Sequence, residues 1–158
     1  MSYPAARVFN EAVPVLATTQ KLLAYLQAPA TLAARIFVGM AFFRSGLTKI
    51  VDWDTTLALF ADEYHVPLLP THVAAVAGTF GELFFPVLLI LGLFGRFSAL
   101  SLSVINVVAV LSLSEIGPAA LQQHQFWGAL LVAIVLWGPG KLSVDAWWWP
   151  KLARKAAR

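Results

Sequence analysis

The sequence of 158 residues contains no cysteine, and this absence excludes several kinds of chemistry at once. Disulfides, thiol redox relays, cysteine-ligated iron–sulfur clusters and thiolate zinc sites all require cysteine. Only three histidines are present, at positions 65, 72 and 124, and no two share the middle of one expected helix, as bis-histidine haem ligation would need. We therefore expect no metal site, and any redox role requires an electron carrier from outside the chain.

Charge is also scarce. Charged residues make up 12% of the chain, against about 25% in an average soluble domain. Apolar residues make up 59%, and the mean hydropathy is +0.76. Too few polar side chains remain to cover a surface in water, so the expected solvent is a lipid bilayer. Phosphate-binding loops, metalloprotease helices, serine nucleophile elbows and nucleic-acid motifs are missing as well.

Four segments are long and apolar enough to cross a bilayer. They are residues 31–51, 73–93, 97–114 and 124–141, with boundaries known to a few residues. The chain is therefore expected to form an all-α membrane bundle of four helices, with residues 1–158 as one domain.

The distribution of basic residues predicts the orientation of these spans. With four spans, one side of the membrane receives Arg7, Lys21, Arg96, Lys141, Lys151, Arg154, Lys155 and Arg158. The loops on the other side, residues 52–72 and 115–123, contain neither lysine nor arginine. Because loops rich in Lys and Arg stay in the cytoplasm, both termini are predicted to be cytoplasmic.

Two further helices are expected at the membrane surface. The segment from about Phe9 to Gln27 has a moderately amphipathic helical pattern, and Glu11 and Pro14 make it unlike a secretory signal. In the loop 52–72, an apolar face is formed by Trp53, Leu57, Phe60 and Tyr64. We expect a short helix there, capped by Asp52 or Asp54, that either covers the outer mouth of the bundle or acts only as an aromatic anchor.

The C-terminal stretch DAWWWPKLARKAAR combines three tryptophans with a basic tail. Tryptophan favours the headgroup level, and cations favour anionic lipids of the inner leaflet. This pattern predicts a membrane anchor rather than a site for nucleic acid.

Several short motifs, in this order and spacing, resemble the DoxX family of small four-span bacterial membrane proteins. They extend from Arg35 to Asp145 and comprise Arg35, Gly39, Gly46-Leu47-Thr48-Lys49, Glu82, Pro86, Leu91-Gly92-Leu93, Arg96 and Gly138-Pro139-Gly140-Lys141 with Leu142-Ser143 and Asp145. The resemblance implies a location in the bacterial inner membrane and an association with membrane redox complexes, including quinone-reducing ones. The family has no agreed catalytic residues, so no mechanism is carried over.

The stretches SGLTKI, WDTTLALF and EYHVPLLP resemble more particularly the HvfX-like branch. Members of that branch are often encoded beside enzymes of the DUF692 type, which modify cysteines in small secreted metal-binding peptides. The resemblance implies an accessory or quinone-facing subunit of a redox or peptide-maturation system, not an enzyme by itself. A homo-oligomer is left open.

The spans contain an unusual set of polar residues, which form the candidate intramembrane site: Arg35, Arg44, Lys49, Glu82, Asn106 and His124. Ionisable residues in a span usually face the bundle interior, a partner or a water-filled cavity. In the first span Arg35, Gly39, Gly46 and Lys49 share one face, and the glycines allow close approach of another helix.

Three interpretations of these residues remain open. Glu82 pairs with a cation of the first span while Arg35 and Lys49 extend towards the two interfaces; or the polar groups line a pocket for quinone carbonyls or an oxyanion; or they line a path for a small solute, preferably an anion. Counting about 1.5 Å per residue from the outer boundary places Glu82 and Arg44 at similar depth. We therefore predict a Glu82–Arg44 pair.

Overall fold

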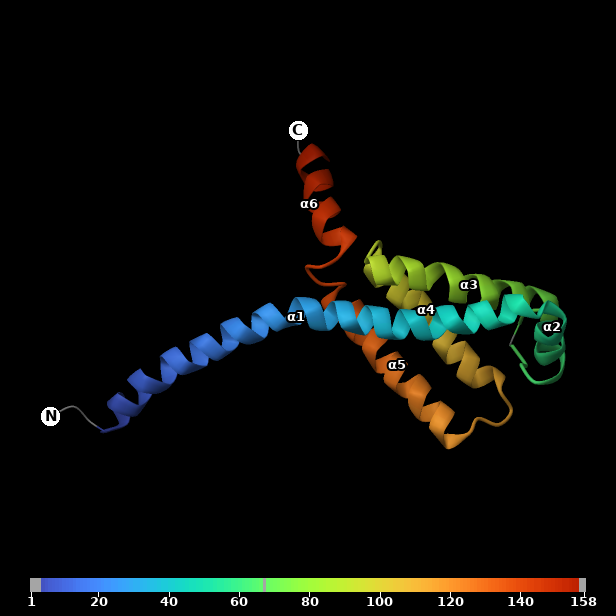
Figure 1. The fold of residues 1–158 in the computed structure, drawn as a ribbon, viewed down its shortest axis with the longest axis horizontal. Coiled ribbons are helices and arrows are strands. Elements are labelled where there is room, and N and C mark those ends of the chain that lie inside the picture. The colour runs from blue at the N-terminus through green and yellow to red at the C-terminus, as the bar shows by residue number, and fades with distance from the viewer. Residues whose placement is uncertain (1–3, 67, 157–158) are drawn as a thin grey trace.

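The computed structural model describes residues 4–66 and 68–156, and it is helical throughout most of that range (Figure 1). Within these residues the chain forms six helices: α1 (Pro4–Val51), α2 (Trp53–Asp62), α3 (Thr71–Leu91), α4 (Gly95–Ser112), α5 (Pro118–Trp137) and α6 (Val144–Ala156). Four of them are long and apolar enough to cross a membrane, namely α3, α4, α5 and residues Val13–Val51 of α1. The predicted helical membrane bundle is confirmed.

The four long helices pack in the order of the chain. The first packs against α3, α3 against α4, and α4 against α5. The core is formed by Val38, Phe42, Leu89, Ala99, Leu102, Leu131 and Ile134. Large apolar side chains such as Phe37, Phe80 and Phe97 are exposed on the outside of the bundle, where a bilayer replaces water as their surroundings.

The bundle has two distinct ends (Figure 1). At the α2 end, α1 passes into α2, α2 leads to α3, and α4 leads to α5. At the α6 end, α3 turns into α4, and α5 is followed by α6, which projects from the bundle. These two names are used below.

The predicted boundary between a surface helix and the first span is wrong. Residues 4–51 form one continuous helix that includes Pro14 and Pro29. A proline inside a helix removes one backbone hydrogen bond and favours a bend, but it does not oblige the helix to end. Figure 1 shows that α1 changes direction near its middle, the part that holds Pro29, and that its N-terminal half extends away from the bundle.

The short helix predicted in the loop 52–72 is confirmed as α2. Asp52 caps it, because its side chain accepts a hydrogen bond from the backbone N–H of Thr55 at 3.0 Å. Its apolar face covers part of α3, where Phe60 packs against Ala74 and Ala75. The chain after α2 is attached to the end of α4, since the N–H of His65 donates to the carbonyl of Ser112 at 2.8 Å.

Candidate functional site

Two glycines bring α1 and α3 into close contact. A Cβ atom at Gly39 would lie 2.7 Å from the side chain of Ile90, and a Cβ atom at Gly46 would lie 2.9 Å from Leu83. Real Cβ atoms do not approach other atoms this closely, so neither position accepts a larger residue without a shift. The predicted role of the glycines in close helix packing is confirmed.

The close approach allows Lys49 of α1 to form an ion pair with Glu82 of α3. The Lys49 ammonium also donates a hydrogen bond to the hydroxyl of Ser45 at 3.1 Å. Arg44 is exposed on another face of α1. The predicted Glu82–Arg44 pair is therefore wrong. Lys49 forms the pair because it lies on the same face of α1 as the glycines that pack against α3. Arg44 has a depth similar to that of Glu82, but it lies on a different face and does not reach it.

His124 and Asn106 form a second polar contact, between α5 and α4. The side-chain amide of Asn106 donates to the backbone carbonyl of His124 at 3.0 Å, and its oxygen lies 2.8 Å from His124 Nδ1. Asn106 thus holds both the backbone and the ring of His124. A side chain at Gly128 would disturb this contact, because its Cβ would lie 3.2 Å from the Asn106 amide nitrogen.

Arg35 lies far from both contacts, at the α6 end. Its guanidinium donates to the carbonyl of Pro139 at 2.6 Å and to that of Ile90 at 2.7 Å, and the residue is only 1% exposed. The expected extension of Arg35 towards the interface is therefore wrong. Its planar group instead satisfies carbonyls near the C-terminal ends of α3 and α5, which no intrahelical donor reaches.

Asp145 has a structural role that the sequence motif did not reveal. Its carboxylate accepts hydrogen bonds from the backbone N–H groups of Phe94 and Gly95, at 2.8 and 2.7 Å. Phe94 and Gly92 both have positive φ, of 48° and 68°, so the turn between α3 and α4 is tight. The carboxylate stabilises the start of α4, where N–H groups lack helical partners.

A cavity of about 380 Å³ at the α2 end joins the Lys49–Glu82 pair to His124. Its size and its largely apolar walls are typical of small-molecule sites. It is lined by Ser45, Lys49, Phe60, Tyr64, Val66, Leu69, Ala74, Ala77, Gly78, Glu82, Val104, Ile105, Val108, Ala109, Ser112, Leu113 and His124. Of the six predicted site residues, three line this cavity, Asn106 supports it through His124, and Arg35 and Arg44 lie elsewhere.

Tyr64 and Ser45 belong to the same wall but were not selected from the sequence. Burial raises the pKa of Tyr64, with further contributions from Glu63 and Glu82, so its phenol remains a neutral hydrogen-bond donor at physiological pH. Tyr64 was noticed only for its place on the apolar face of α2. Its backbone pairs with that of Leu113 after α4, and helical periodicity does not predict this contact.

The cavity can supply hydrogen bonds to a ligand from several sides. Lysine, tyrosine and serine donate, a carboxylate accepts, and an imidazole does either depending on its tautomer. In the described part of the chain, no group of three or more His, Cys, Asp or Glu residues could hold a metal ion. The arrangement therefore suits an organic molecule with polar atoms on an otherwise apolar body.

The fold and the cavity define a class: helical integral membrane proteins with four apolar helices and a polar cluster that lines a cavity at one end of the bundle. Comparison with protein families matches residues 30–115 to the family described as DoxX. The chain is also 32% identical over 123 residues to a protein of Haemophilus influenzae described as uncharacterized; the match covers 72% of this chain and 80% of that protein. The chain belongs to the DoxX family. No solved structure matches it.

Proposed function

We propose that the chain binds the ring of a membrane quinone in the cavity at the α2 end, as an accessory subunit of a membrane redox system. The single observation that carries the proposal is that the Lys49–Glu82 pair and His124 line the same apolar cavity. A quinone has two carbonyl oxygens that accept hydrogen bonds and an apolar tail that stays in lipid. The cavity offers donors for the oxygens and apolar walls for the ring.

The protonation chemistry of the cavity supports this choice. Reduction of a quinone consumes two electrons and two protons, and reoxidation of the quinol releases them. Lys49, Glu82 and His124 are groups that exchange protons, and Tyr64 is a neutral donor beside them. The chain itself has no cysteine, so the electrons would come from a partner protein. The quinone is thus a ligand that this subunit positions.

Transport of a small solute is the alternative function, and the packing of the bundle disfavours it. The apolar core with Val38, Phe42 and Leu102 fills the bundle beyond the cavity towards the α6 end. There, the guanidinium of Arg35 is engaged with two backbone carbonyls. A continuous polar path would require both arrangements to open.

The proposed identity of the redox system rests on sequence resemblance alone. The motifs shared with the HvfX-like branch favour a partner among the DUF692-type enzymes that modify metal-binding peptides, and the inner membrane of a bacterium as the location. The quinone proposal does not depend on that partner, because it rests on the residues of the cavity.

A titration with a short-tailed quinone analogue tests the proposal. The thermal stability of the purified protein in detergent should rise with the concentration of the analogue, since a ligand that binds only the folded state stabilises it. Lys49→Leu should weaken the analogue's binding at least tenfold. Arg44→Leu is the matched control, because it removes a cation from the same helix but outside the cavity. The proposal fails if saturating analogue gives no stabilisation, or if both variants weaken binding equally.

A further inference from the structure

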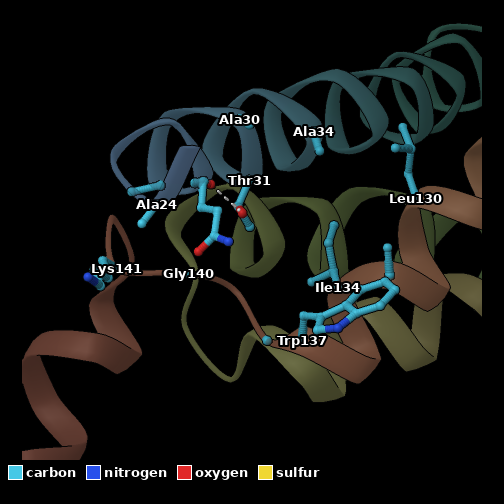
Figure 2. Close-up of a pocket in the computed structure, with 13 residues that line it drawn as sticks. Ala24, Ala30, Thr31, Ala34, Leu130, Ile134, Trp137, Gly140 and Lys141 are labelled. Carbon is cyan, nitrogen blue, oxygen red and sulfur yellow. Dashed lines mark hydrogen bonds between the residues drawn. The ribbon is translucent and has the colours of Figure 1, made fainter. Parts of the chain in front are cut away.

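A second hollow lies at the α6 end, between α1 and the last turns of α5 (Figure 2). It is a groove of about 540 Å³, larger than the cavity at the α2 end. Figure 2 shows Ala24, Ala30, Thr31 and Ala34 on the α1 side and Leu130, Ile134 and Trp137 on the α5 side. The remaining lining residues are Gln27, Ala28, Ala133, Gly138, Gly140 and Lys141. None of the six residues of the candidate intramembrane site lines it.

The groove is open because small side chains form its α1 wall and glycines form its floor. After α5, the segment 138–141 turns beneath α1 with φ of 88° at Gly138 and 81° at Gly140. A Cβ atom at Gly140 would lie 3.1 Å from Thr31 Cβ. The hydroxyl of Thr31 is used within α1, where it donates to the carbonyl of Gln27 at 2.7 Å. The walls are therefore mostly apolar, with Gln27 as a polar exception, and a residue larger than glycine at position 140 would press against Thr31.

A lysine lines the outer end of the groove. Lys141 lies there and is exposed (Figure 2). Lys21 precedes Ala24 by three residues, so it lies on the same face of α1 one turn further out. In the part of the chain that the structure describes, no acidic residue lines the groove, and the Lys49–Glu82 ion pair is at the other end of the bundle. The mouth thus complements an anion.

The residues around the groove are arranged like the levels of a lipid leaflet, with tryptophans and lysines near its mouth and apolar side chains further in. Trp137 is 78% exposed at the groove, and Trp147, Trp148 and Trp149 follow on α6. Tryptophan favours the headgroup level of a membrane. Measured along α1 by the helical rise, the groove extends roughly 15 Å from Ala24 to Ala34, towards the middle of the bundle. An apolar slot with cations at headgroup level fits one lipid molecule.

We propose that this groove binds an anionic glycerophospholipid, with an acyl chain between α1 and α5 and the phosphate beside Lys141. A second copy of the chain is a poorer occupant. A second copy has a formal net charge of +3, so it complements the cations at the mouth less well than an anionic headgroup does. A flexible acyl chain is narrow enough to enter the groove.

The test is a lipid titration of the delipidated protein in detergent, followed by native mass spectrometry and thermal unfolding. Phosphatidylglycerol and phosphatidylcholine with identical acyl chains separate the effect of charge from that of the chain, and inorganic phosphate tests the anion alone. We expect one tightly bound phosphatidylglycerol and no stabilisation by phosphate. Phosphatidylcholine should bind about fivefold more weakly, because Lys141 is the lysine that lines the groove and one lysine near the surface contributes about 1 kcal/mol.

Three variants locate the site. Lys141→Ala should remove the preference for phosphatidylglycerol, and Ala28→Phe, which fills the groove, should weaken both lipids. Lys155→Ala removes an equal charge from exposed α6 and should change neither. Equal affinity for the two lipids, an equal effect of Lys155→Ala, or a dimer that Ala28→Phe dissociates would overturn the proposal. The quinone titration reports on the α2 end, so either proposal can fail alone.

Discussion

The two ends of the bundle use buried charge in different ways. At the α6 end, Arg35 and Asp145 bond to backbone groups and leave those groups satisfied. At the α2 end, Lys49 and Glu82 bond to each other, and Lys49 also to Ser45, beside a cavity. A charge bonded to the backbone fixes the ends of helices, whereas a charge bonded to another side chain can exchange its partner for a ligand.

The comparison also gives the motifs of the DoxX resemblance separate roles. Arg35, Gly92, Pro139 and Asp145 meet at the α6 end: Arg35 bonds to Pro139, and the N–H of Asp145 donates to the carbonyl of Gly92 at 3.0 Å. Lys49 and Glu82 are the motif residues at the α2 end. We infer that the α6 end maintains the bundle and that the α2 end binds the ligand. Three substitutions test this division, and a fourth tests the cap of α2.

The largest effect is expected from Arg35→Met. It removes two charge-assisted hydrogen bonds and leaves the carbonyls of Ile90 and Pro139 without these donors. The expected loss in the free energy of unfolding is roughly 3–5 kcal/mol, measured by thermal and denaturant unfolding in detergent. Arg35→Lys should lose less, because one ammonium cannot reproduce the planar fork. The folded fraction of Arg35→Lys should bind the quinone analogue as the wild type does. A loss of binding by this variant would contradict the separate roles of the two ends.

A smaller loss of stability, with weaker analogue binding, is expected from Glu82→Gln. The ammonium of Lys49 then lies in the bundle without its carboxylate, at a cost of about 2–3 kcal/mol. Replacing both partners, Lys49→Met with Glu82→Leu, should recover much of the stability but none of the binding. Should the double variant be no more stable than Glu82→Gln, the pair would have no energetic role.

Gly46→Ala tests the α2 end in a second way, because it should move α1 away from α3 near the Lys49–Glu82 pair. The new Cβ would lie 2.9 Å from Leu83 and 3.1 Å from Glu82 Cβ. We expect a loss of about 1–2 kcal/mol from overpacking and weaker analogue binding. Gly117→Ala is the control, because nothing lies within 4 Å of its added Cβ and it does not line the cavity. If the two variants lost equal stability and equal analogue binding, the distance between α1 and α3 would not determine either property.

The smallest effect concerns pH at the start of α2. Hydrogen bonds from Thr55 lower the pKa of Asp52 below its ordinary value. The cap therefore stabilises α2 fully above that ordinary value, and the stabilisation is lost as the pH falls through the lowered pKa of the folded protein. Fluorescence of Trp53, in a variant that keeps this tryptophan alone, should report the change. Asp52→Asn should retain the cap and lose the pH dependence, and an unchanged pH dependence would contradict the assignment.

The elements of the fold were predictable because hydropathy is a local property. Each predicted span overlaps a long helix of the structure. The sequence left Asp52 and Asp54 open as caps of α2, and the structure shows that Asp52 is the cap. The continuity of α1 was not predictable, since the sequence shows Pro29 but not how the helix accommodates it. Orientation across the membrane stays a prediction.

Three of the six predicted site residues line the cavity, but the pairing of Glu82 with Lys49 was not predicted. The glycine face of α1 already indicated Lys49 as the residue nearest α3, yet estimates of depth favoured Arg44. The partners of Arg35 lie 55 and 104 residues away and are backbone carbonyls, which carry no signal in a sequence. The cavity depends on the packing of α2 and of the segment after it, and helical periodicity does not describe that packing.

Photo-crosslinking with a quinone analogue that carries the reactive group on its ring tests the central claim most directly. Peptide mapping of the wild-type protein locates the ring within one helix turn. The account predicts labels in the peptides that line the cavity at the α2 end, around Lys49, Tyr64 and His124, and competition by unlabelled quinone. Competed labels confined to the α6 end, around Arg35 and Pro139, would contradict it.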